Sequence, residues 1–172
     1  MKRALFLLPV SLLGLSSQGF AQTFSKNGQL LVAGDVRNTA AAQVAVAQAN
    51  LFGSMLLSYH VDPRTGGPAR LTIATRYERR LVEVDPRDYR VKLLRKEVTK
   101  NALPGGALIC RSYAPIDAIV RVARSQHPGR PIEVFPPHRP GAAWRAQIAA
   151  KTYAVNFDKK GRATFGALRS RG

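Results

Sequence analysis

The chain has 172 residues, of which 45% are hydrophobic and 22% charged, so it can form a packed core and is not disordered throughout. Its 27 lysine and arginine residues against 10 acidic residues give a formal net charge of +17. The basic residues occur along the whole chain, which excludes a detachable basic tail and favours contact with anionic surfaces.

The first 21 residues have the pattern of a secretory signal peptide. Lys2 and Arg3 precede an apolar run from Leu5 to Leu15, and we predict cleavage after Ala21. The apolar run is too short to span a bilayer comfortably, which argues against an uncleaved anchor. We therefore expect a periplasmic or secreted mature chain without a transmembrane segment.

An extended segment is expected over residues 22–38, followed by a first α+β unit over residues 39–96. The spacing of apolar residues predicts an alanine-rich helix over residues 40–51, and Gly53 is expected to end it. Alternating apolar and polar residues then predict strands near 55–61, 71–77, 81–85 and 89–94, with turns at 62–68, 78–80 and 85–88.

A charged and glycine-containing linker is expected over residues 97–115, and a second α+β unit over residues 116–172. Its helix is expected to bury Ile116, Ile119, Val120 and Ala123 and to end at Pro128-Gly129. Strands are expected near 132–134, 144–148, 153–157 and 163–168. Cys110, the only cysteine, cannot form an intrachain disulfide, and its apolar neighbours favour burial over a disulfide with another chain or a reactive role.

The two units share a pattern when the sequence is shifted by 73 residues. The shift places apolar strand residues on apolar strand residues and one turn-opening aspartate on another. The alternative is that two unrelated α+β segments share a common period. The matched pairs are Leu71 with Trp144, Ile73 with Ala146, Val82 with Val155, Val84 with Phe157, and Asp85 with Asp158.

Residues 116–168 resemble a PepSY domain, and residues 39–94 resemble a fainter copy. The resemblance implies an α+β unit with a helix on an antiparallel sheet. The predicted elements give each unit one helix and three or four strands, and the two units either pack together or continue one sheet. The resemblance also implies an extracytoplasmic role in binding or restraining peptidases or other envelope proteins, without catalytic residues. The matching residues are Ala118, Ala123, Pro128, Gly129, Ile132, Val134, Tyr153, Val155, Asp158 and Gly161.

Residues for catalysis or metal binding are not evident in the sequence. His60, His127 and His138 have no metal-ligand spacing, and each is expected at the surface. His60 and Asp62 share one side of a predicted strand end, but no third partner for a catalytic set is identifiable. We therefore predict a protein that is not an enzyme and has no cofactor or metal.

The strongest chemical signal is a set of basic residues on and beside the predicted strands. Tyr77, Tyr89, Trp144 and Tyr153 lie among them, and their alternation with aliphatic residues favours a position in the core over stacking on bases. The candidate residues for binding an anion or a partner are Arg76, Arg79, Arg80, Arg87, Arg90, Lys92, Arg145, Lys151, Lys159, Lys160 and Arg162.

Two functions follow from these expectations. The first is a binding or inhibitory module that engages an envelope protein or peptidase through a sheet edge or a basic face. The alternative is a basic envelope protein that binds an anionic polymer such as nucleic acid, lipopolysaccharide or acidic glycan.

Overall fold

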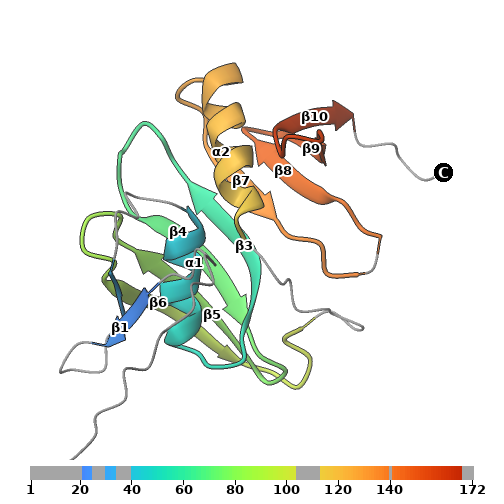
Figure 1. Cartoon of the computed structure of the whole chain (residues 1–172). Coiled ribbons are helices and arrows are strands. Elements are labelled where there is room, and N and C mark those ends of the chain that lie inside the picture. Colours follow the sequence, from blue (N-terminus) through green and yellow to red (C-terminus); the bar gives the residue numbers. More distant parts are fainter. Residues whose placement is uncertain (1–20, 25–29, 34–39, 104–112, 140, 168–172) are drawn as a thin grey trace, which may run out of the picture.

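The fold is α+β, with two helices and one antiparallel sheet of eight strands (Figure 1). This computed structural model describes residues 21–24, 30–33, 40–103, 113–139 and 141–167. The signal peptide predicted for residues 1–21 lies outside the described residues except for Ala21, and Cys110 lies outside them as well.

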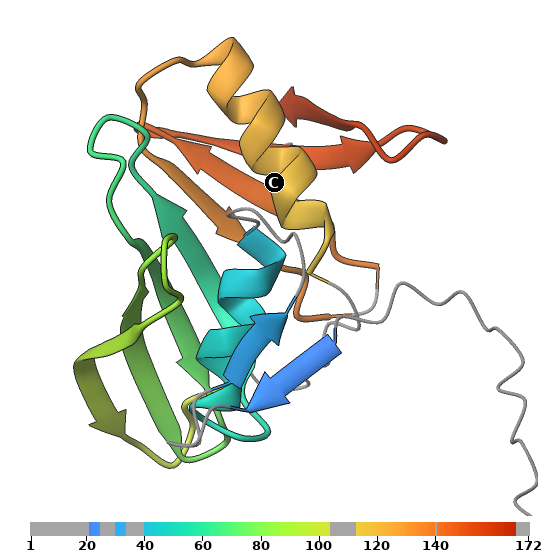
Figure 2. The ribbon, with the colours of Figure 1, turned by 60° about the vertical axis from the view of Figure 1, so that its left-hand side comes forward.

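The helices α1 (Ala40–Ala49) and α2 (Pro115–Gln126) lie on the same face of the large sheet (Figure 2). Both begin and end close to the predicted positions. The buried residues of α2 are the four that the helical spacing predicted, Ile116, Ile119, Val120 and Ala123. These residues and those of α1 contribute to one hydrophobic core against the sheet.

The large sheet has the strand order β10-β9-β8-β7-β3-β4-β5-β6, and a separate hairpin of two strands lies beside α1 (Figure 2). The hairpin consists of β1 (Ala21–Phe24) and β2 (Leu30–Ala33). The strands of the large sheet are β3 (Met55–Val61), β4 (Ala69–Ala74), β5 (Glu78–Val84), β6 (Val91–Val98), β7 (Ile132–Phe135), β8 (Trp144–Ile148), β9 (Lys151–Phe157) and β10 (Ala163–Ala167).

One continuous sheet replaces the two separate units of helix and sheet that the sequence suggested. The strands β3 and β7 pair antiparallel at its centre, with Tyr59 opposite Val134 and Val61 opposite Ile132. Buried strand residues from both halves, such as Leu71 and Ala146, belong to one hydrophobic core together with residues of both helices, so the two halves share that core. The structure therefore confirms the α+β class and does not show two separate units.

The two halves of the sheet nevertheless follow the same order of elements, a helix and then four antiparallel strands. The hairpins β4–β5 and β8–β9 have the same register, because Leu71 lies opposite Val82 and Trp144 lies opposite Val155. These are the pairs that a shift of 73 residues relates. The shift therefore matches strand pairing as well as apolar pattern.

The turns that follow β5 and β9 each open with an aspartate, as predicted. The Oδ1 atom of Asp85 accepts a hydrogen bond from the backbone N–H of Arg87 at 2.8 Å, and that of Asp158 accepts one from Lys160 at 2.8 Å. The first turn is one residue longer, and Tyr89 rather than a glycine occupies a left-handed conformation in it, with φ of 55°.

The predicted turn over residues 78–80 is wrong, because β5 begins at Glu78. The chain turns two residues earlier, at Arg76 and Tyr77, where the N–H of Thr75 donates to the carbonyl oxygen of Glu78 at 2.8 Å. The strand β6 likewise continues to Val98, two residues into the predicted linker. In both places hydrogen bonds to a neighbouring strand hold charged residues in a strand despite their low strand propensity.

Candidate functional site

The strand β6 forms one edge of the sheet and has an unusually exposed surface. Among the described strands it pairs with β5 alone (Figure 1). None of its eight residues is buried, and the exposed fractions of Leu93 and Val98 are 51% and 74%. Its apolar residues are interspersed with the basic residues Lys92, Arg95 and Lys96. An edge of this kind offers backbone groups and apolar side chains to a further strand.

The predicted basic residues do not come together in one site. Arg76 lies in the β4–β5 turn, with Arg79 and Arg80 at the start of β5, while Arg87 and Arg90 lie in the turn beyond its other end. Seven extended residues separate these groups by about 20 Å. The remaining candidates are Lys92 in β6, Arg145 in β8, Lys151 at the start of β9, and Lys159, Lys160 and Arg162 in the β9–β10 turn.

Two of these arginines support the fold. The Arg80 side chain contacts the Glu78 carboxylate through Nε. Its Nη1 atom donates a hydrogen bond of 3.0 Å to the carbonyl oxygen of Asn50, which follows α1. The Nη2 atom of Arg79 donates a hydrogen bond to the carbonyl oxygen of Ala102 at 3.2 Å. These contacts give both guanidinium groups a structural role, which lowers their value as binding residues.

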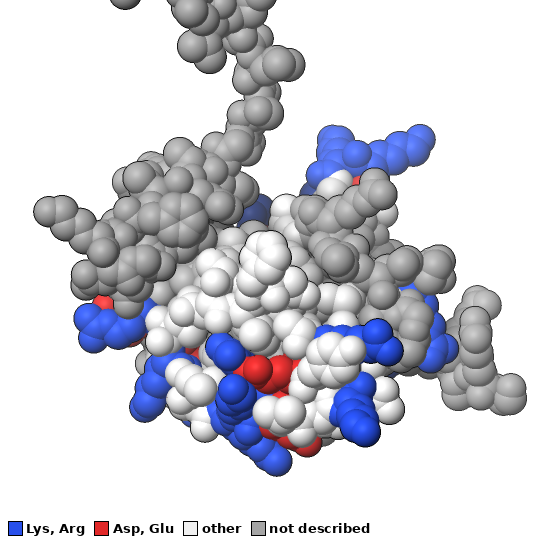
Figure 3. All heavy atoms as spheres, turned by 90° about the horizontal axis from the view of Figure 1, so that it is seen from below, with Lys and Arg blue, Asp and Glu red and all other residues white. Residues whose placement is uncertain are grey.

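Other candidates pair with acids in the turns. The Nη2 atom of Arg90 lies 3.5 Å from Oδ2 of Asp88, and Nε of Arg162 lies 2.7 Å from Oδ2 of Asp158. Seen from the end of the molecule at the bottom of Figure 1, basic side chains form scattered groups with acidic atoms between them (Figure 3). The charges on this end are therefore mixed and do not form a continuous basic face.

Aromatic residues near the basic side chains are mostly packed on the core, as predicted. Tyr89, Trp144 and Tyr153 contact core residues. Tyr77 departs from the prediction, with 58% of its surface exposed and the guanidinium carbon of Arg76 5.4 Å from its ring centre. Its position in a tight turn, outside the strand that was predicted to include it, explains the exposure.

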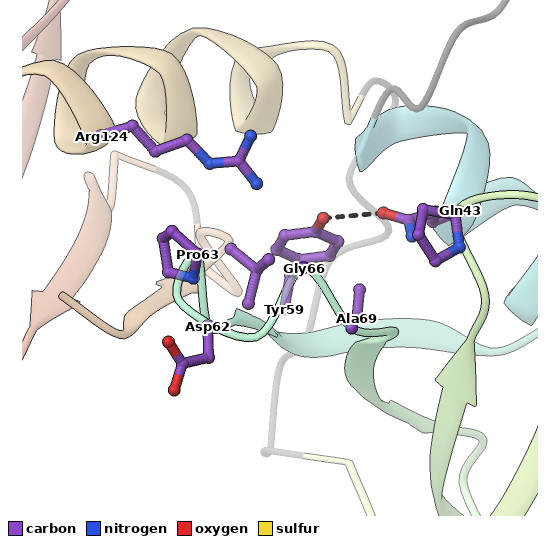
Figure 4. Close-up of a pocket in the computed structure, with 10 residues that line it drawn as sticks. Gln43, Tyr59, Asp62, Pro63, Gly66, Ala69 and Arg124 are labelled. Carbon is purple, nitrogen blue, oxygen red and sulfur yellow. Dashed lines mark hydrogen bonds between the residues drawn. The ribbon is translucent and has the colours of Figure 1, made fainter. Parts of the chain in front are cut away.

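A pocket of about 380 Å³ lies between the two helices and above the central strand β3 (Figure 4). The buried side chains of Gln43 and Tyr59 form part of its floor. The Tyr59 hydroxyl donates to Oε1 of Gln43 at 2.8 Å, and Nε2 of Gln43 donates to the carbonyl oxygen of Val84 at 3.2 Å. This chain of hydrogen bonds fixes the tyrosine hydroxyl at the pocket wall.

Arg124 reaches from α2 into the same pocket, toward Tyr59 (Figure 4). Burial raises the pKa of Tyr59, and the Arg124 charge opposes that rise, so the hydroxyl is neutral. The nearby Asp62 carboxylate points away from Arg124 and binds the Arg64 side chain at 2.8 Å (Figure 4). Hydrogen bonds from Arg64 lower the pKa of Asp62 to about 2. Arg124 forms no salt bridge with a described residue.

The histidines differ in their surroundings. His127 is partly buried, with its ring 6.0 Å from that of Tyr153. His138 is also partly buried, and burial lowers its pKa. Both side chains are therefore partly covered by neighbouring residues, and His60 is partly buried as well. Within the described ranges, no group of three or more His, Cys, Asp or Glu residues has the geometry to hold a metal.

The sequence did not indicate the pocket, whose residues come from α1, β3, the β3–β4 turn, β4, the β5–β6 turn and α2. A glutamine at a buried position of an alanine-rich helix was the only available signal. Gln43 occupies such a position, since apolar residues surround it in the sequence. Tyr59 falls within the predicted strand over residues 55–61, and the local sequence around Arg124 gives no sign that it enters a pocket.

Comparison with known proteins leaves the chain without a family. It matches no protein-family model and no curated protein. A solved structure of a "putative lipoprotein" from Clostridium difficile 630 aligns with a TM-score of 0.43 and 8% identity, over 79% of this chain and 96% of that one. A similarity at this level carries no argument about function. Neither described helix is long and apolar enough to cross a bilayer.

Proposed function

We propose that the protein is a binding module of the cell envelope that engages an extended segment of a partner protein along β6. The observation that supports this proposal is the eight-residue edge strand, which has no buried residue and carries Leu93 and Val98 largely exposed. A partner strand added there would form backbone hydrogen bonds and cover these side chains. Lys92 and Arg95 would favour an acidic segment and disfavour pairing between copies of this chain, whereas Lys96 lies 3.6 Å from the Glu78 carboxylate.

The resemblance of residues 116–168 to a PepSY domain remains part of this proposal, and with it a peptidase as one kind of partner. What supports it is the order of elements from α2 to β10 and the turn that Asp158 opens with Gly161 in a left-handed conformation. A module of this kind would act by covering a surface of its partner and would not catalyse a reaction. The signal peptide predicted for residues 1–21 would place it outside the cytoplasm.

Site-specific photo-crosslinking tests the proposal. A photoreactive amino acid replaces Leu93 or Leu94, which are exposed on the edge strand β6, and the same amino acid in place of Arg121, exposed on α2, is the matched control. In envelope extract we expect one discrete protein adduct from the β6 positions and none from position 121. The charge reversal Lys92→Glu with Arg95→Glu should reduce that adduct at least about fivefold. Equal labelling from both surfaces would overturn the proposal.

A second candidate function is binding of an anionic polymer. It is favoured by Lys151, Lys159 and Lys160, which are exposed around β9 and form no salt bridge with a described residue. Contact with about six phosphates predicts a slope near −5 for the logarithm of the association constant against the logarithm of salt concentration. Fluorescence titration with a labelled DNA duplex at several salt concentrations measures the slope. A flat salt dependence would exclude this function.

A further inference from the structure

The pocket between the helices has the chemistry of a site for one terminal residue of a peptide. Its apolar surface comes from Val61, Pro63, Ala69 and Pro86. Its polar groups are the Tyr59 hydroxyl and the Arg124 guanidinium, which lie next to each other (Figure 4). The pocket has room for a side chain of moderate size, because its volume is about 380 Å³.

The positive charge of Arg124 in the pocket has no carboxylate of a described residue paired with it. Asp62, a carboxylate in the pocket lining, is committed to Arg64 through two side-chain hydrogen bonds of 3.1 and 2.8 Å. The other carboxylate near Tyr59, that of Asp117, accepts a backbone hydrogen bond from Ala40 at 2.7 Å. Arg124 therefore has hydrogen-bond donors available for an anion, and a carboxylate matches its planar fork.

The Tyr59 hydroxyl limits which carboxylate fits. Its proton is donated to Gln43, so it presents lone pairs to the pocket and accepts hydrogen bonds there. A ligand must therefore offer an N–H donor close to its carboxylate. The terminal residue of a peptide has both groups on one Cα atom, together with a side chain for the apolar wall.

We propose that this pocket binds the C-terminal residue of a peptide, with the carboxylate on Arg124, the amide N–H on the Tyr59 hydroxyl and an aliphatic side chain against Val61 and Ala69. The site lies on the helix-covered side of the sheet and includes no residue of β6. It goes beyond the edge-binding function and stands or fails independently of it.

Titration of the full mature chain with N-acetyl-leucine, followed by amide and side-chain shifts in ¹H–¹⁵N NMR spectra, tests the proposal. We expect saturable shifts at the Gln43 side chain and at Gly66 and Gly67, which line the pocket. N-acetyl-leucine amide, which lacks the carboxylate, should produce none. Acetyl-Ala-Ala-Leu should bind at least as tightly as N-acetyl-leucine. If N-acetyl-leucine binds but acetyl-Ala-Ala-Leu does not, the pocket accepts a small carboxylate and not the end of a peptide. That result would overturn the proposal.

Variants on α2 provide the matched control. Arg124→Gln should weaken N-acetyl-leucine binding by about tenfold or more, because a charged hydrogen bond is lost. Arg121→Gln removes the same charge from an exposed position of the same helix that does not line the pocket, so it should change the affinity less than about twofold. Both variants keep exposed positions polar, and circular dichroism checks that each is folded. An equal loss in both variants, or no shifts with the native chain, would refute the site.

The two proposals are distinguishable by one further variant. Lys92→Glu with Arg95→Glu should reduce the crosslinked adduct on β6 at least about fivefold and leave the N-acetyl-leucine shifts in place. Arg124→Gln should do the reverse. Loss of both activities in either variant would show that the two sites are not independent.

Discussion

The carboxylate of Asp117, in the first turn of α2, accepts hydrogen bonds from the first two backbone N–H groups of α1. Its Oδ1 atom lies 2.7 Å from the nitrogen of Ala40, and its Oδ2 atom lies 3.3 Å from that of Ala41. These N–H groups have no partner within α1. One carboxylate therefore lies at the positive ends of both helices and ties them together across 77 residues of sequence.

We expect Asp117→Ala to lower the free energy of unfolding by about 1 kcal/mol, the usual effect of removing an N-terminal helix cap. Urea denaturation followed by circular dichroism measures it. Glu97→Ala, at an exposed position of β6, is the control and should change stability by less than about 0.5 kcal/mol. The interpretation fails if both substitutions have the same small effect.

The buried hydrogen bond between Tyr59 and Gln43 gives a second prediction. Tyr59→Phe leaves Oε1 of Gln43 without its donor in a buried position, so stability should fall by about 1 to 3 kcal/mol. Tyr77→Phe, at a position with 58% exposure, should have almost no effect. A double-mutant cycle with Gln43→Met should recover part of the loss, because an apolar pair needs no hydrogen bond.

The β8–β9 turn contains a strained alanine. Ala149 has φ of 54°, in the left-handed region, and is exposed. Ala149→Gly should stabilise the protein by about 0.5 to 1 kcal/mol, since relief of strain exceeds the entropic cost of glycine. Its neighbour Ala150 has no positive φ, so Ala150→Gly should instead destabilise slightly. Thermal denaturation of the two variants measures the difference, and the same sign for both would contradict this account.

His138 gives a prediction of pH dependence. Burial lowers its pKa in the folded state, a hydrogen bond with the Leu57 backbone opposes the change, and the charge of Arg145 lowers the pKa further. Between the unfolded value, about 6.5, and the lower folded value, the unfolded chain binds more protons. Stability should therefore fall as pH decreases through this range.

The variant His138→Gln isolates that contribution. We expect its unfolding free energy to change less than that of the native chain when the pH is lowered from 7 toward 5 in denaturant titrations. Below the folded pKa the native chain should show no further loss from this histidine. Identical pH profiles for the two proteins would show that His138 titrates in the same way in both states.

Most strands could be predicted because they bury alternate side chains under the helices. Leu71 and Ile73 in β4, and Ala146 and Ile148 in β8, show this period directly in the sequence. The turn at Tyr77 could not be placed, because an aromatic residue that continues the alternation looks like another strand residue. Only the pairing of Thr75 with Glu78 reveals that the chain reverses there.

Two features could not be predicted for a different physical reason: the pairing of β3 with β7 that joins the two halves of the sheet, and the pocket. Both depend on contacts between residues far apart in sequence, such as Tyr59 with Val134 and Ala40 with Asp117. The residues involved have ordinary local patterns. The basic residues are visible in the sequence, but whether they lie close together in the fold depends on which ends of β5 and β9 the turns occupy.

The antiparallel pairing of β3 with β7 has a consequence for any attempt to shorten this protein. Cutting the chain near residue 103 would leave β3 in one fragment and β7 in the other, each with a bare hydrogen-bonding edge flanked by core side chains such as Val61 and Val134. Neither fragment is expected to persist as a monomer. Mixed together, the two fragments should associate through these strands and restore the native circular-dichroism spectrum.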